Sequence, residues 1–241
     1  AAAGGAGGGG DLPRAVWLGA LAMLGSAYAF AALTSALPLF YVPMFDWTAR
    51  ELGMVGTAFG FSMAVYNILL TKRIIAFLGP GSSSIVASLL IAIAVVLSPL
   101  IRSPSAHVAG MLLPFALGWA LQLPALSQLS ARHVAADRRG AAMGVLVGAL
   151  SLGRAVSPFT TGYLYKAAYL VAPYGEEDVK NPAMMETVPF SFAPFVVAAV
   201  ACVIGVLAVI AETTLMQPGA AASTAGFRGK KEGYLALEER R

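Results

Sequence analysis

The chain has 241 residues, of which 58% are hydrophobic and 12% are charged. An average soluble domain carries about 25% charged residues, and the mean hydropathy here is +0.75. These values exclude a soluble globular enzyme, a disordered tail and a nucleic-acid-binding module. They predict an all-α integral membrane protein, whose net charge of +4 reflects basic loops rather than affinity for nucleic acid.

Six apolar stretches reach or approach the length of about 20 residues that a membrane-spanning helix needs. We predict spans over residues 15–42, 52–70, 84–101, 108–129, 140–165 and 190–211. Together they form one membrane domain, residues 15–212. We expect a flexible Ala/Gly-rich tail at residues 1–14 and a basic, disordered tail at residues 213–241. Because the chain begins with Ala1, we expect a processed or truncated N-terminus.

The basic residues predict the orientation of these spans. An even number of spans places both termini on one side, and eleven Lys or Arg residues fall on that side. They are Arg14, Lys72, Arg73, Arg132, Arg138, Arg139, Arg228, Lys230, Lys231, Arg240 and Arg241. The opposite loops hold four, namely Arg50, Arg102, Lys166 and Lys180. We therefore expect the termini on the cytoplasmic side of a plasma membrane, or on the stromal or matrix side of an organelle inner or thylakoid membrane.

Arg154 is the principal candidate for a functional role. A rise of 1.5 Å per residue places it roughly 20 Å into the fifth predicted span. A charge at the bilayer centre costs about 2.5–3.5 kcal/mol, so the guanidinium should face protein, water or a partner charge. No Asp or Glu lies within the six predicted spans, so Asp46, Glu51, another chain or an anionic substrate must supply the counter-charge. Packing against backbone carbonyls or snorkelling to an interface are the alternatives.

Three uncharged polar residues within or beside spans are further candidates for a substrate pathway or a partner contact. Gln122, Ser127 and Asn67 could line a cavity, or they could form interhelical hydrogen bonds worth about 0.6 kcal/mol each. Helix packing is predicted at residues with no side-chain chemistry, namely Gly140, Gly144, Gly148 and Pro158. We predict no catalytic residue, metal ligand or cofactor, because no nucleophile–base pair or His/Cys/Asp/Glu cluster has suitable spacing.

Residues 116–165 carry the most specific pattern in the chain. They read ALGWALQLPALSQLSARHVAADRRGAAMGVLVGALSLGRAVSPFTTGYLY. This stretch resembles the tenth and eleventh helices of Major Facilitator Superfamily transporters, especially the drug/proton antiporter-like branch. The matching positions are Gly118, Pro124, Ser127, Arg139, Gly140, Gly144, Gly153, Arg154, Pro158 and Gly162. A looser resemblance extends over residues 16–211 and includes the segment from Thr71 to Gly79, which is similar to a family loop but lacks its acidic residue.

The resemblance implies the C-terminal half of such a transporter, which has two six-helix halves with a cavity between them. The implied function is movement of a small solute by alternating access with a partner half, and any proton coupling would lie outside these spans. The alternative is a non-transporting structural subunit of a large membrane complex, possibly an organellar energy-converting one. The implied partners are membrane lipid and a second six-helix half, a second copy or a larger complex.

Overall fold

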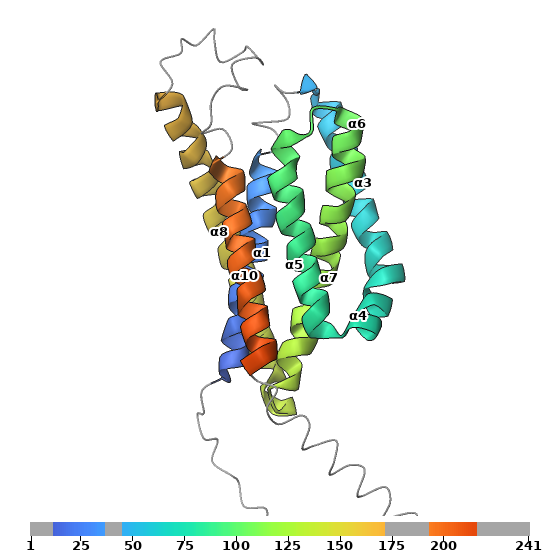
Figure 1. The fold of residues 1–241 in the computed structure, drawn as a ribbon, viewed down its shortest axis with the longest axis vertical. Coiled ribbons are helices and arrows are strands. Elements are labelled where there is room, and N and C mark those ends of the chain that lie inside the picture. The colour runs from blue at the N-terminus through green and yellow to red at the C-terminus, as the bar shows by residue number, and fades with distance from the viewer. Residues whose placement is uncertain (1–11, 37–44, 172–192, 216–241) are drawn as a thin grey trace, which may run out of the picture.

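The computed structural model describes residues 12–36, 45–171 and 193–215, with side chains to Leu164 in the second range. All regular structure in these ranges is helical (Figure 1). Six helices are long and apolar enough to cross a membrane, which confirms the predicted all-α membrane fold. Most of both predicted tails, residues 1–11 and 216–241, lies outside the described residues.

The six spans are built from unequal pieces. The first is α1 (Arg14–Ala36). The second joins α3 (Ala49–Tyr66), a π-helical turn (Asn67–Thr71) and α4 (Lys72–Leu78), and the third is α5 (Pro80–Leu97), which continues as a 3-10 turn (Ser98–Leu100). The fourth joins α6 (Pro104–His107), a π-helical turn (Val108–Leu112) and α7 (Leu113–Arg132). After a 3-10 turn (Ala136–Arg138) come α8 (Arg139–Val171) and α10 (Ala193–Leu215).

The connection between the second and third spans is shorter than predicted. The expected loop from Thr71 is instead helical as far as Leu78, because residues Lys72–Leu78 include no proline or glycine that would break a helix. The chain reverses at Gly79, whose φ of +80° favours glycine. Pro80 then opens α5 at a helix position where its missing N–H costs nothing.

The helices are unequally buried. In Figure 1, α1 packs against α8 and α10, α5 packs against α7 and α10, and α3 packs against α7. In the spans that contain α1, α5, α7 and α10, at least half of the residues in the apolar stretch are buried inside the bundle. The corresponding share is 22% for the span of α8 and 6% for the span of α3 and α4. The two flanking helices therefore leave much of their surface open.

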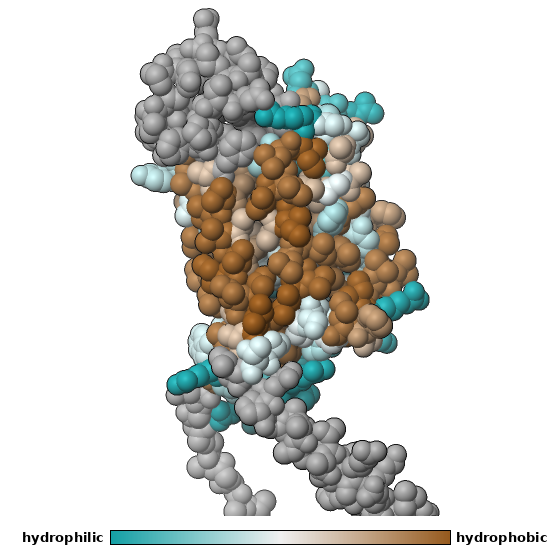
Figure 2. All heavy atoms as spheres, viewed as in Figure 1, coloured by the Kyte–Doolittle hydropathy of each residue, from teal (hydrophilic) through white to brown (hydrophobic). Residues whose placement is uncertain are grey.

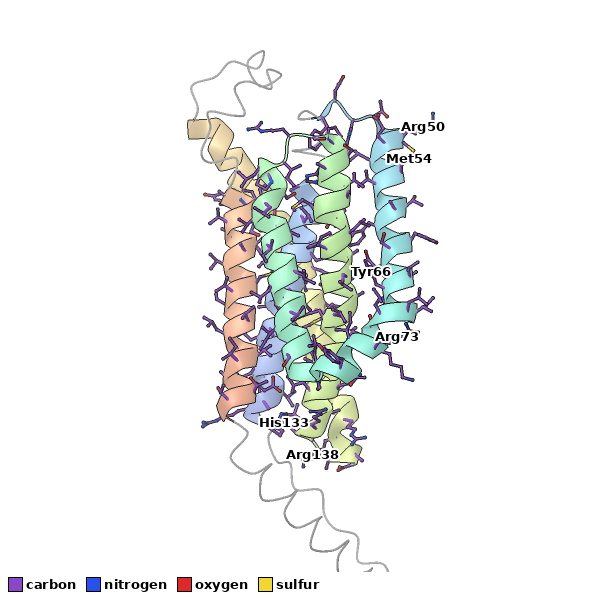
Figure 3. All side chains as sticks on the ribbon, turned by 45° about the vertical axis from the view of Figure 1, so that its right-hand side comes forward. Arg50, Met54, Tyr66, Arg73, His133 and Arg138 are labelled. Carbon is purple, nitrogen blue, oxygen red and sulfur yellow. The ribbon has the colours of Figure 1, made fainter. Side chains whose placement is uncertain are left out.

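The surface has the layering of a membrane protein. Figure 2 shows a hydrophobic band around the middle of the visible face, with hydrophilic residues at both ends. We call the end where α1 begins and α10 finishes the terminal end. The described basic residues there are Arg14, Lys72, Arg73, Arg132, Arg138 and Arg139, whereas Arg50 and Arg102 lie at the opposite end (Figure 3). Which side of the membrane the terminal end faces stays a prediction.

Glycine brings α8 close to α1, but at a different position from the one predicted. A Cβ on Gly153 would lie 2.7 Å from the Leu24 carbonyl oxygen, so this contact requires glycine. By contrast, a Cβ on any of three other α8 glycines would have no atom within 4 Å: Gly140, Gly144 and Gly148. These three glycines therefore make no close helix contact within the described chain, and their predicted packing role stays a prediction. Pro158 lies inside α8 with an exposed side chain.

The reason for the difference is the face that α8 turns toward α1. The buried residues of α8 are Ala142, Leu146, Gly153, Ser157 and Thr161. Along α8, the buried residues Ala142 and Leu146 are each two positions away from the nearest of the three glycines, Gly140, Gly144 and Gly148. Two residues correspond to about 200° around a helix, so the three glycines lie on the opposite, exposed face.

Candidate functional site

An aromatic cluster joins three helices in the middle of the bundle. It consists of Phe30 on α1, Phe59 on α3, and Phe115 and Trp119 on α7. The Phe30 ring stacks on Trp119 with centroids 4.3 Å apart, and on Phe115 at 5.8 Å. Phe59 lies 6.0 Å from Phe30 and 5.8 Å from Phe115. Such pairs contribute about 0.5–1.5 kcal/mol each beyond the area they bury, so the cluster holds the less buried α3 against the bundle.

Arg154 extends from α8 over this aromatic cluster. Its guanidinium carbon lies 4.9 Å from the Phe30 ring centroid and 5.2 Å from that of Trp119. Both distances are within the range of cation–π attraction, which is worth about 0.5–2 kcal/mol. Trp119 is near the middle of the span Pro104–Arg132. The guanidinium is therefore held at mid-depth rather than snorkelling to an end, and its side chain is exposed on the bundle surface.

No carboxylate among the described residues forms an ion pair with Arg154. Glu51, one of the two predicted counter-charges, caps α3 at the opposite end instead. Its carboxylate accepts a hydrogen bond from the Thr48 N–H at 2.6 Å, and its own N–H donates to Thr48 Oγ1 at 3.4 Å. Asp46, the other candidate, also lies at that end, just ahead of α3. Within the described chain, Arg154 is therefore a cation without a charged partner.

Gln122 is not part of this site. It is 0% exposed and lies between α7 and α5, where its Nε2 donates to Ser88 Oγ at 3.1 Å. The Ser88 hydroxyl lies 3.3 Å from Gln122 Oε1. The interhelical hydrogen bond, which the sequence left open, is what forms in this structure, and a role of Gln122 in a substrate pathway stays a prediction. The physical reason is that an amide buried between helices needs a partner for both its donor and its acceptor.

Ser127 and Asn67 bond to their own helices. Ser127 Oγ donates to the Leu123 carbonyl at 2.6 Å and is partly buried. Asn67 Nδ2 donates to the Met63 carbonyl at 3.1 Å, and the side chain is exposed. Neither forms a hydrogen bond with Arg154 or with the aromatic cluster, so the structure does not bring the four predicted residues together.

The sequence analysis missed a carboxyl group within the spans. It ended the sixth span at residue 211, but α10 continues to Leu215 and includes Glu212, which is 1% exposed. A signal existed, because the buried residues Ala198, Cys202 and Val209 recur at helical spacing and Glu212 falls on the same face. The prediction that no carboxyl group lies in these spans is therefore wrong.

Six helices of membrane-spanning length and composition among the described residues define a polytopic membrane protein. The family model of the Major Facilitator Superfamily matches residues 19–235. The chain therefore belongs to the Major Facilitator Superfamily, as the resemblance predicted. Comparisons with curated proteins and with solved structures returned no match. Members of this family are transporters rather than enzymes, which favours a transporter-like role over a structural subunit.

Proposed function

We propose that this chain is one six-helix half of a transporter that moves a small anionic organic solute by alternating access. It corresponds to the C-terminal half in the drug/proton antiporter-like branch and works with a second six-helix unit. The observation that carries the proposal is Arg154, an exposed guanidinium at mid-depth, stacked on Phe30 and Trp119 and without a carboxylate partner.

The open surfaces of α3 and α8 support the proposal that a second six-helix unit packs against this chain. A Cβ would meet no atom within 4 Å at Gly53, Gly56 and Gly60 on α3, or at Gly140, Gly144 and Gly148 on α8. Small residues at three- to four-residue spacing let another helix approach closely. Both helices that flank the bundle therefore offer a surface suited to helix contact, and nothing in the described chain uses it.

The chemistry around Arg154 supports an anionic solute. A guanidinium binds carboxylate or phosphate through paired, charge-assisted hydrogen bonds, and the rings beneath it offer an apolar surface for the rest of the molecule. A cationic solute would meet repulsion from Arg154 and no compensating carboxylate in the described site. In this proposal the terminal end faces the cytoplasm, the stroma or the matrix, and the membrane is a plasma membrane or an organelle inner or thylakoid membrane.

The test compares two probes that share a ring and differ in charge, benzoate and benzylammonium. The full chain is placed in lipid nanodiscs with Trp17→Phe and Trp47→Phe, which leaves Trp119 as the fluorescent reporter. We expect benzoate to change the emission of Trp119 and benzylammonium to have no effect. Arg154→Ala should weaken benzoate binding about tenfold or more, since a charged hydrogen bond is worth about 1.5–3 kcal/mol.

Two further variants serve as controls. Arg154→Lys keeps the charge and should retain part of the binding, whereas Arg139→Ala, at the terminal end of α8, should leave it unchanged. In proteoliposomes that contain the chain with its co-purifying partners, benzoate uptake should be lost in Arg154→Ala. Equal binding of benzoate and benzylammonium, or benzoate binding that survives Arg154→Ala, would overturn the proposal.

A further inference from the structure

A second polar site lies near the terminal end of the bundle, away from the aromatic cluster. Glu212 on α10 is 1% exposed, and neither carboxyl oxygen has a hydrogen-bond partner in the described chain. His133, which follows α7, places its Nε2 3.6 Å from Glu212 Oε1. A buried charge is costly unless it is paired and hydrogen-bonded. This carboxyl group therefore needs either a cationic partner or a proton.

The other carboxyl oxygen borders a space that Gly19 leaves open. A Cβ on Gly19 would lie 3.0 Å from Ser130 Oγ and 3.7 Å from Glu212 Oε2. Ser130 is also 1% exposed, and its hydroxyl lacks a hydrogen-bond partner in the described chain. A hydroxyl and a carboxyl group thus share one buried space, formed by α1, α7 and α10. A neutral carboxyl group suits it, because it offers both a donor and an acceptor.

The site has a route to water. Glu212 and His133 line a cavity of about 590 Å³ at the terminal end, together with Arg132 and the first residues of α5. The side chain of His133 is 25% exposed, whereas that of Glu212 is fully buried. Figure 3 shows His133 and Arg138 at this end of the bundle. A proton from water can therefore reach His133 before it reaches Glu212.

The charged residues near Glu212 are positive, and they lie at the end of α7 or in the segment that leads from it into α8. Arg132 and His133 follow from α7, and Arg138 and Arg139 lie at the same end. The residues of α1 and α5 that border the site, Gly19, Pro80 and Gly81, are uncharged, as is Leu146 of α8, which lies beside the same Gly19 position. Burial and the Arg132 charge hold the pKa of His133 below its usual value. Both effects favour the neutral imidazole, so His133 is a poor standing cation for Glu212.

We propose that Glu212, Ser130 and His133 form a proton-binding site that exchanges with water at the terminal end. The proton resides on Glu212 Oε1. On release, this O–H bond breaks, an N–H bond forms at His133 Nε2, and the imidazolium then gives a proton to water in the cavity. The 3.6 Å separation exceeds a direct hydrogen bond, so a side-chain rotation or one bridging water completes the transfer.

A proton fits this site better than a metal ion does. Among the residues that the structure describes, no three His, Cys, Asp or Glu side chains come together as metal ligands. Arg132, which lines the same cavity, also repels a cation. The site requires only the described bundle, so it does not rest on the proposed transport function.

The test measures the infrared C=O stretching band of protonated carboxyl groups in the full chain, in nanodiscs, from acidic to alkaline pH. With ¹³C-labelled glutamate, we expect one glutamic acid band to persist at neutral pH. Glu212→Gln, which imitates the neutral acid, should lose this band. Glu51→Gln is the matched control, because Glu51 is exposed to solvent in its capping contact, and it should keep the band.

His133→Gln tests the exchange route. Without the imidazole, the Glu212 proton loses its acceptor on the way to water, so the deuterium shift of this band after transfer to D₂O should develop more slowly than in the native chain. A native chain without a protonated glutamic acid band at neutral pH would overturn the proposal, and this result needs no variant to fold. A band that survives Glu212→Gln would overturn it too. So would a band that sodium chloride removes and choline chloride does not, since that result indicates a metal-cation site.

Discussion

The glycines of this bundle fall into two groups that behave differently. Gly25, Gly118 and Gly153 bring helices into backbone contact, and a Cβ on Gly118 would lie 2.8 Å from the Ala87 carbonyl oxygen. A Cβ added to the glycines on the exposed faces of α3 and α8, such as Gly56 and Gly144, would meet no atom within 4 Å. The first group explains why the bundle holds together, and the second indicates surfaces that a partner can approach.

Helix α7 shows a similar contrast between the residues that contact α5 and those beneath Arg154. Gln122 and Gly118 face α5 and are buried in packing contacts. Phe115 and Trp119 belong to the aromatic cluster beneath Arg154. The buried amide of Gln122 is therefore hydrogen-bonded within the described chain, whereas the exposed guanidinium of Arg154 has no carboxylate partner there. The contrast is between a polar side chain that joins two helices of the bundle and one that remains open at its surface.

The largest effect is expected from a matched pair of glycine substitutions. In Gly25→Ala, the new methyl group would collide with the Ala201 carbonyl oxygen on α10, and overpacking of this kind costs about 1–3 kcal/mol or more. In Gly144→Ala the methyl group meets open space and improves helix propensity by up to about 1 kcal/mol. Thermal unfolding in detergent should separate the two variants clearly. Equal stability of both would show that the contrast between packed and open glycines is wrong.

A smaller effect is expected at Gln122. Gln122→Leu leaves the Ser88 hydroxyl without its partner and should lower the free energy of unfolding by about 1 kcal/mol. Adding Ser88→Ala should recover part of the loss, because no unpaired polar group then remains. Benzoate binding, followed by Trp119 fluorescence, should stay unchanged in both variants. Loss of binding without loss of stability would instead place Gln122 in the pathway.

The smallest effect is a pH dependence at His133. The pKa of His133 lies below its ordinary value in the folded chain, whereas the unfolded chain takes up this proton near pH 6.5, roughly the ordinary value. Stability from this group is therefore present above that pH and lost as the pH falls through it. The unfolding temperature should fall less on acidification in His133→Gln than in the native chain. A steeper fall in the variant would mean that the folded state favours the imidazolium.

The spans could be predicted because the membrane imposes a local rule. Each must cross about 30 Å of hydrocarbon, so a run of apolar residues is sufficient evidence of a helix. The ends were less predictable: Thr71 and Glu212 are polar residues that the structure keeps helical. A polar residue indicates a position near the membrane surface, but polarity alone does not end a helix that contains no proline or glycine.

The candidate site could be predicted only in part. Arg154 was identifiable because a charge in a span is costly wherever the neighbouring helices lie. Its partners Phe30 and Trp119 were not, because they come from two other helices and depend on the rotation of each. The same rotation buries Gln122 and exposes Gly144, and nothing in the local sequence sets it.

The central claim is that the exposed faces of α3 and α8 are covered by a second six-helix unit, and cysteine cross-linking tests it most directly. The single cysteine, Cys202, is buried and is first replaced by alanine. Gly56→Cys and Gly144→Cys then report on the two faces, and Val203→Cys, 49% exposed on α10, is the control. In native membranes, we predict that the first two cross-link to a unit with six membrane spans, while Val203→Cys meets only lipid. Lipid contact alone at all three positions would contradict the account.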